Sequence, residues 1–357
     1  MSTIYKMPPS EVRENITACM EAGLVPFVTS SPGLGKSAVV KQIAEEFGLQ
    51  LIDLRLSQCA PEDLMGLPMR NAQGRAEFAP FAMFPIKGDP KPEGKNGWLL
   101  FLDEFNSATT SVQAAAYKLI LDHMVGMYEL HEDVYCVCAG NLATDRAIVK
   151  DMSTAMQSRL IHLEMVVSHR EFMDHAMKND FDHRIMGFLE FQPAKLHLFK
   201  ADHADKTFAC PRTWEFASKL IKGKPVNKIS PGLIAGTVSD GVAVEFMEFL
   251  KEYDNLPSYQ RICAEPDQVE IPSSSGTRFA IVTMLLSKYD RADFADVAKF
   301  MKRMPPEIQV IYFRGVLRVD AAKPEMRRTK EYIAASHHLT RFLTDDDAND
   351  ATNSRAA

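Results

Sequence analysis

The chain has 357 residues, which is enough for about two domains with substantial cores. Hydrophobic residues make up 46% and charged residues 25%, a balance typical of soluble globular proteins. No apolar run approaches the roughly 20 residues that span a bilayer, and the N-terminus lacks a secretory pattern, so we expect a cytoplasmic protein without a membrane segment. The formal net charge of −6 and the lack of a Lys/Arg block argue against a protein that binds nucleic acid over its whole surface.

The cysteines are scattered and form no C-x-x-C pair, so neither a zinc site nor a disulfide framework is predicted. Cys136 and Cys138 alternate along an apolar strand and would point to one face. We interpret both as core residues.

The first predicted elements are a helix over 10–22 and a buried strand over 24–29. A glycine-containing loop follows the strand, and a helix begins near Lys36. Backbone N–H groups of such a loop can cradle phosphates, a lysine can contact the β- and γ-phosphates, and a hydroxyl can ligate magnesium. The predicted nucleotide-binding residues of this loop are Ser31, Pro32, Gly33, Leu34, Gly35, Lys36 and Ser37.

The loop departs from the pattern G-x-x-x-x-G-K-[ST] because Ser30 stands where the first glycine belongs. An ordinary turn between a strand and a helix is the alternative. The strand before the loop and the helix after it favour the phosphate loop.

A second strand is predicted over 50–55 and a short helix from Pro61. The stretch 69–80 is predicted to form a protruding hairpin, and the Pro-, Gly- and Lys-rich stretch 85–97 an exposed loop.

An apolar run from Gly97 stops at Asp103 and Glu104, as expected of a buried parallel strand whose C-terminal end faces a ligand. We expect Asp103 to hold the magnesium water shell and Glu104 to accept a proton from the attacking water. The alternative is a helix start, since carboxylates also favour first turns. Together with the upstream loop, this pair indicates a P-loop NTPase with a catalytic glutamate.

A helix over 109–123, a second hairpin over 124–134 and a strand over 133–139 come next. The strand ends in Gly140-Asn141, where a neutral amide can bond the γ-phosphate or the attacking water; a plain turn is the alternative. A short helix over 151–159 then ends at Arg159, either a surface group or a guanidinium that reaches a neighbouring subunit's site.

Beyond Val166 the pattern predicts only helices, at 168–178, 183–190 and 212–222 and then across 230–342. The last stretch includes predicted helices over 237–253 and 277–289, with a loop predicted over 273–276. Arg212 lies at a helix start, where the dipole disfavours cations, so it is a candidate phosphate contact; a capping salt bridge is the alternative. The predicted organisation is an α/β nucleotide-binding core with a parallel sheet over 1–166, an all-α lid over 167–228, a helical C-terminal extension over 229–344 and a disordered acidic tail over 345–357.

The ordered motif set resembles the AAA+ ATPases. It looks most like their MoxR-like branch, through Pro61-Glu-Asp-Leu-Met-Gly66 and its hairpin, Asp103-Glu-Phe-Asn-Ser-Ala108 and Pro211-Arg-Thr213. Ser107 departs from the branch, which usually has arginine there. The resemblance implies ATP and Mg²⁺ as cofactors, Ser37 and Asp103 as metal ligands, Asn141 as first sensor, Arg159 as arginine finger and Arg212 as second sensor.

The function expected from these motifs is ATP hydrolysis by a homo-oligomeric ring, expected to be a hexamer, that remodels or activates a partner complex. The resemblance suggests a partner with a von Willebrand factor A domain and a protein substrate. The alternative is a DNA motor or loader, with Lys87, Lys91 and Lys95 as phosphate contacts, although the acidic net charge weighs against it. A structural ring that binds but does not hydrolyse nucleotide is a third hypothesis.

Overall fold

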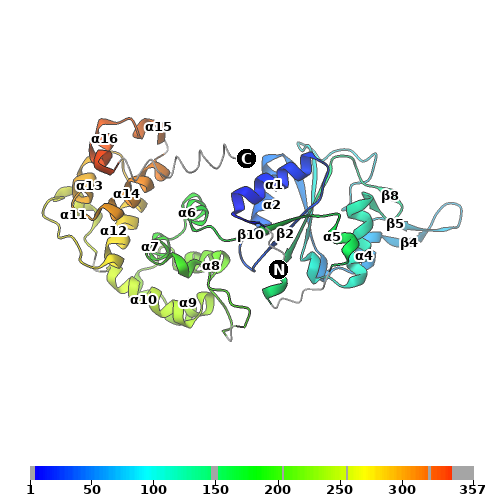
Figure 1. Ribbon diagram of the computed structural model, residues 1–357, viewed down its shortest axis with the longest axis horizontal. Helices are drawn as coiled ribbons and strands as arrows, with labels where there is room; N and C mark the ends of the chain where they lie inside the picture. Colours follow the sequence, from blue (N-terminus) through cyan, green and yellow to red (C-terminus); the bar gives the residue numbers. More distant parts are fainter. Residues whose placement is uncertain (1–4, 146–151, 203–204, 255, 321–322, 340–357) are drawn as a thin grey trace. The chain divides into compact units, whose positions relative to one another are not determined.

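The chain divides into two compact units in the computed structural model, which describes residues 5–145, 152–202, 205–254, 256–320 and 323–339 (Figure 1). The first unit comprises Met1–Glu171 and Phe199–Ala204, and the second comprises Phe172–Leu198 and Asp205–Ala357.

A parallel sheet forms the centre of the first unit, and its strand order within the described residues is β1-β10-β2-β9-β6-β3. The strands are β1 (Lys6–Met7), β2 (Pro26–Ser30), β3 (Leu49–Arg55), β6 (Gly97–Asp103), β9 (Val134–Asn141) and β10 (Ile161–Met165).

Both faces of this sheet are buried, which explains why its central strands are apolar throughout. Leu99 and Phe101 of β6 belong to the core on the side of α1 (Pro9–Glu21) and α2 (Lys36–Glu46). Alternate residues, among them Leu100, belong to the core on the side of α3 (Pro61–Met65) and α4 (Thr110–Leu121). The two layers result from the alternation of side chains along each strand.

Two small antiparallel hairpins protrude from this unit (Figure 1). One pairs β4 (Leu67–Arg70) with β5 (Ala76–Ala79), and the other pairs β7 (Met124–Val125) with β8 (Tyr128–Glu129). The two hairpins lie side by side, and a hydrogen bond of 3.4 Å from Tyr128 Oη to Glu77 Oε1 joins them.

The described part of the second unit has helices joined by loops and contains no strand. Its helices are α6 (His169–Lys178), which starts just before the boundary, α7 (His183–Phe191), α8 (Pro211–Ile221), α9 (Pro231–Val238), α10 (Asp240–Asp254), α11 (Tyr259–Ala264), α12 (Ser275–Ser287), α13 (Phe294–Met301), α14 (Pro306–Val319), α15 (Lys323–Met326) and α16 (Lys330–Ser336). A cluster of the fully buried rings of Phe188, Trp214 and Phe246 joins α7, α8 and α10, with centroids 5.3 to 5.8 Å apart.

The predicted fold class is confirmed: a parallel sheet flanked by helices precedes a helical C-terminal part. Two local predictions were wrong. The helix expected to run from Thr237 is broken at Ser239, whose φ of 85° is incompatible with a right-handed helix, and Ser275 and Gly276 begin α12 instead of forming a loop. Asp151, where the short helix over 151–159 was predicted to begin, and the predicted acidic tail lie outside the described residues.

In the described part of the chain, no helix has the length and apolar character needed to cross a membrane.

Candidate nucleotide site

The loop between β2 and α2 has the backbone conformation of a phosphate cradle. Gly33 and Gly35 have φ angles of 79° and 93°, which side-chain-bearing residues rarely adopt. Gly35 directly precedes α2, and no side chain among the described residues caps that helix. The first backbone N–H groups of α2 therefore point outward at a positive helix end, which suits a bound phosphate.

Lys36 begins α2 and turns back toward the sheet. Its ammonium donates to Ser30 Oγ at 2.9 Å, to the Ser30 carbonyl at 3.3 Å and to Asn141 Oδ1 at 3.2 Å. Ser30 is completely buried, so the serine that replaces the expected glycine serves here as an anchor for Lys36.

Ser37 and Asp103 meet across the loop and the end of β6. Ser37 Oγ donates to Asp103 Oδ2 at 3.2 Å. One hydroxyl and one carboxylate are hard oxygen ligands, and Mg²⁺ typically uses one or two such groups together with phosphate and water oxygens. These two residues fit a magnesium ion bound beside a nucleotide, although the described residues hold no cluster of three His, Cys, Asp or Glu side chains.

A second carboxylate adds negative charge near this pair. Burial raises the pKa of Asp53, the charge of Asp103 raises it further, and Arg55 lowers it. Asp53 and Asp103 thus repel each other, and their combined negative charge favours the binding of a cation.

Glu104 follows the last residue of β6 in a left-handed conformation, with a φ of 55°. Its N–H donates to Asp103 Oδ1 at 2.8 Å, which fixes the turn between the two carboxylates. The Ser57 hydroxyl, in the 3-10 turn after β3, donates to Glu104 Oε2. The positive φ and this hydrogen bond hold the Glu104 carboxylate off the strand axis.

Asn141 ends β9 and is fixed by Asn106, which is only 6% exposed. Asn106 Nδ2 donates to the Asn141 carbonyl at 2.7 Å, and the Asn141 N–H donates to Asn106 Oδ1 at 3.1 Å. Gly140 makes this approach possible, because a Cβ at that position would lie 2.3 Å from Asn106 Oδ1.

Most of the predicted site residues lie at or next to the loop between β2 and α2. Lys36 donates a hydrogen bond to Asn141, its neighbour Ser37 donates one to Asp103, and the N–H of Glu104 donates one to Asp103. The other predicted residues of the loop, Ser31, Pro32, Gly33, Leu34 and Gly35, lie between β2 and α2.

Two predicted residues lie elsewhere. Arg159 is exposed beyond the end of α5 (Thr154–Gln157) and donates to the Ala155 carbonyl at 3.1 Å. Arg212 is exposed at the second position of α8, in the second unit.

The sequence did not predict the roles of three residues: Ser57, which bonds to Glu104; Asn106, which fixes Asn141; and Gly140, whose lack of a Cβ leaves room for Asn106. Only Asn106 carried a signal, because an asparagine two residues after a carboxylate pair at a strand end can bridge to a neighbouring strand. Cys136 and Cys138 are buried as predicted, and burial raises the pKa of the Cys136 thiol to about 12, so this thiol is inert near neutral pH.

Comparisons with known proteins agree with this geometry. Residues 27–162 match the model of the ATPase family associated with various cellular activities (AAA). No curated protein matches the chain.

Solved structures give weak likenesses. A point mutant of RuvB from Thermotoga maritima is 17% identical with a TM-score of 0.38, and the match covers 72% of this chain and 74% of that one. NtrX from Brucella abortus is 13% identical with a TM-score of 0.40, over 88% of this chain and 69% of that one. At these scores neither likeness bears on function. The segment that matches the family model contains the phosphate loop, both carboxylates and Asn141, and the first unit of this chain is therefore a P-loop domain of the AAA type.

Proposed function

We propose that this protein is an ATP-hydrolysing ring ATPase that uses nucleotide turnover to remodel or activate a partner protein complex. The main support for this proposal is that five polar residues lie together at the C-terminal ends of the adjacent strands β2, β9 and β6. They are Lys36, Ser37, Asp103, Glu104 and Asn141. Ligands of open parallel sheets bind at this edge.

Each residue has a distinct role in the proposed reaction. The N–H groups of the loop and Lys36 hold the phosphates, and Ser37 with Asp103 would hold magnesium, which supplies charge neutralisation on the phosphates. Glu104 takes the proton of the attacking water, and Asn141 orients that water or the γ-phosphate without adding charge.

The proposal of a ring rests on Arg159. Its side chain is exposed on the surface of the first unit, so it is available to a neighbouring subunit. A guanidinium supplied in trans neutralises charge on the γ-phosphate only when subunits assemble, and this makes hydrolysis depend on the ring. We further propose a hexamer, a lid over 167–228 whose Arg212 senses the nucleotide, and a partner of the von Willebrand factor A type.

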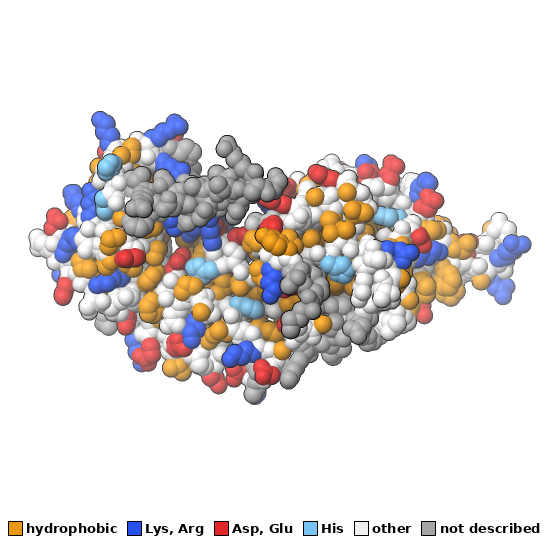
Figure 2. Space-filling view, viewed as in Figure 1, with side chains coloured by type: hydrophobic (Ala, Val, Ile, Leu, Met, Phe, Trp, Pro, Cys, Tyr) orange, Lys and Arg blue, Asp and Glu red, His pale blue; other side chains and the backbone are white. Residues whose placement is uncertain are grey.

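A protein partner is favoured by the surface of the two hairpins. Leu67, Met69, Phe78, Met83 and Met127 are 39% to 67% exposed on and beside them. Figure 2 shows hydrophobic side chains gathered near the base of the β4–β5 protrusion. Clustered exposed apolar side chains are typical of contacts with protein, whereas phosphate backbones select cations.

The alternative of a DNA motor loses two of its proposed contacts. Lys87 pairs with Glu129, and Lys91 pairs with Asp133 at 2.6 Å. The hydrogen bond from Lys87 to Glu129 raises the pKa of Lys87, and that from Lys91 to Asp133 raises the pKa of Lys91. Both ammonium groups thus already contact carboxylates of the same unit, which weakens this alternative.

The test compares ATP hydrolysis by the wild type and Arg159→Ala across a protein concentration series, with molar mass followed by light scattering. We expect wild-type activity per subunit to rise with assembly, and Arg159→Ala to form rings that do not turn over. Concentration-independent activity, or normal turnover by Arg159→Ala, would refute the trans-acting ring. An assembled wild-type ring that releases no phosphate would instead support a purely structural role.

A further inference from the structure

A pocket of about 870 Å³ lies within the second unit, remote in sequence from the nucleotide loop. It is bounded by the α6–α7 turn, the turn after α8, Tyr253 of α10, the end of α12 and the last turns of α14. This volume is in the range of pockets that enclose small organic molecules.

One part of its lining is apolar. Met173, Met177 and Met186 contribute to it together with Leu286 and Ile311. Methionine side chains are flexible and adapt to irregular apolar ligands. The pocket can therefore accept a hydrocarbon or aromatic body.

The rest of the lining carries more positive than negative charge, in contrast to the acidic chain as a whole. Six Lys and Arg residues line the pocket, against three carboxylates. The basic residues are Arg184, Lys222, Lys224, Lys288, Arg314 and Arg318, and the acidic ones are Asp180, Asp182 and Glu190.

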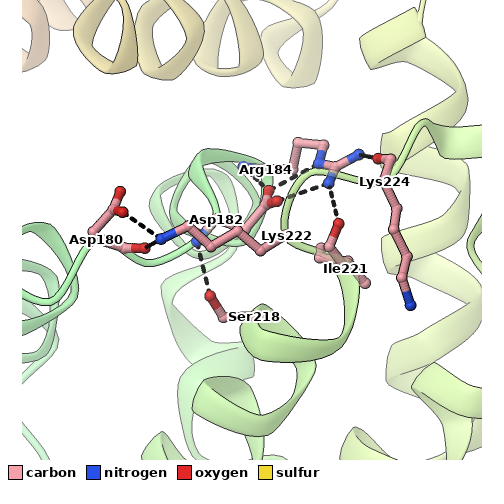
Figure 3. Close-up of polar contacts among 7 residues, drawn as sticks. All are labelled: Asp180, Asp182, Arg184, Ser218, Ile221, Lys222 and Lys224. Atoms are coloured by element: carbon pink, nitrogen blue, oxygen red, sulfur yellow. Dashed lines mark hydrogen bonds and ion pairs between the residues drawn. The ribbon is translucent and has the colours of Figure 1, made fainter.

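Ion pairs take up part of this positive charge, including one of 3.2 Å between Arg318 and Asp174, which lies outside the lining. Asp182 binds Arg184 at 2.7 Å, and Asp180 binds Lys222 (Figure 3). Lys224 contributes its carbonyl to Arg184, while its ammonium points away from the cluster in Figure 3. Neither Lys224 nor Lys288 forms an ion pair with any described residue, and both are exposed.

The Tyr253 hydroxyl is a second, independent sign of a missing ligand. Its oxygen is buried and has no hydrogen-bond partner within the described structure. The ring packs beside His183, with centroids 5.3 Å apart, and both residues line the pocket. A buried hydroxyl without a partner destabilises the protein, and natural structures retain few such groups.

We propose that this pocket binds a small organic anion, in which a carboxylate or phosphate group is attached to an apolar body. The anionic group lies toward Lys224 and Lys288, and the body contacts the methionine side. A shift of the side chains over Tyr253 gives its hydroxyl a partner in the complex. The inference is independent of the proposed ATPase function.

The test is calorimetric titration of the full chain with octanoate, octyl phosphate and the neutral octanamide. Excess ADP and Mg²⁺ are present so that the phosphate loop cannot bind the probes. We expect saturable binding of one or both anions at one site per chain, and much weaker binding of octanamide. The preferred head group distinguishes a carboxylate ligand from a phosphate ligand.

Three variants locate the binding site. The Lys224→Gln/Lys288→Gln double variant is expected to bind the preferred anion at least about tenfold more weakly. Lys302→Gln, an exposed lysine of the same unit outside the pocket, serves as the matched control and should bind like the wild type. Tyr253→Phe should also weaken binding while raising the melting temperature of the free protein by about 2–4 °C, because it removes an unpaired buried hydroxyl.

The proposal is overturned if neither anion binds saturably, if octanamide binds as tightly as the anions, or if the double variant retains wild-type affinity. A Tyr253→Phe variant that melts lower than the wild type would show that the hydroxyl already has a stabilising partner, against the ligand argument.

Discussion

Asn106 and Asn141 exchange two hydrogen bonds, of 2.7 and 3.1 Å, between the turn after β6 and the end of β9. The buried amide of Asn106 satisfies both backbone groups of Asn141, so the side chain of Asn141 is held at the end of its strand beside Lys36. The position of one predicted site residue thus depends on another residue, to which no contact with the nucleotide is assigned.

Asn106→Ala is expected to destabilise the protein by about 2–4 kcal/mol, because it removes the hydrogen bonds of Asn106 to the N–H and C=O of Asn141 in a partly buried setting. Denaturant unfolding monitored by circular dichroism measures this cost. Asn179→Ala is the control, because Asn179 is exposed and its amide bonds only to its own helix turn. This substitution should lower the free energy of unfolding by less than about 1 kcal/mol. Equal effects of the two substitutions would contradict the role given to Asn106.

Gly140→Ala is expected to lower the free energy of unfolding by about 1–3 kcal/mol and to slow hydrolysis. The added Cβ would overlap Asn106 Oδ1 and displace Asn141. Gly236 in α9 has open space around it, so Gly236→Ala should be neutral or slightly stabilising. Thermal unfolding and steady-state phosphate release measure the two effects. Wild-type kcat in a stably folded Gly140→Ala protein would show that the fine position of Asn141 is unimportant.

Glu104→Gln tests the proposed general base without changing the size of the side chain. We expect kcat to fall by about 10²–10⁴ while nucleotide affinity changes little, since only the proton acceptor is lost. Fluorescent nucleotide titration and phosphate release separate these quantities, and light scattering should show that ATP still stabilises the ring. Glu132→Gln, at an exposed position of the same unit, is the control. Undiminished hydrolysis would exclude Glu104 as the base.

Asp180 and Asp182 allow a matched comparison of an exposed and a buried ion pair within one cluster (Figure 3). The Asp182 side chain is 2% exposed and its partner Arg184 is 7% exposed, whereas Asp180 is 86% exposed. Asp182→Asn should cost about 3–5 kcal/mol because it leaves the Arg184 charge buried without its counterion. Asp180→Asn should cost less than about 1 kcal/mol. Denaturant unfolding measures both, and equal costs would contradict the difference in burial.

The same buried pair predicts a pH dependence of stability. Burial alone would raise the pKa of Asp182, but the hydrogen bonds and charge of Arg184 outweigh it, and the pKa is lowered. A lowered folded-state pKa means that the contribution is fully present above the unfolded value of about 3.9 and is lost as pH falls through the folded value. Unfolding free energies measured between pH 7 and pH 3 should therefore fall less steeply in Asp182→Asn than in the wild type. Parallel profiles would refute this assignment.

Local sequence patterns were sufficient for most of the fold. The apolar run from Gly97 predicted a strand buried on both faces, because only such a strand needs hydrophobic residues at every position. The two hairpins were also predicted, since turn residues such as Asn71 and Gly74 mark them locally. The break at Ser239 was not predictable, because a serine with positive φ is set by packing rather than by residue preference.

The sequence by itself determined which chemical groups are available: a phosphate loop, two carboxylates at a strand end and an amide at another, each recognisable because the motif lies within a few residues. Only the tertiary structure decided their neighbours. The strand order places β9 between β2 and β6, which brings Lys36 to Asn141, and places β3 beside β6, which brings Ser57 to Glu104. Such contacts depend on how strands pair and helices pack, which no short segment encodes.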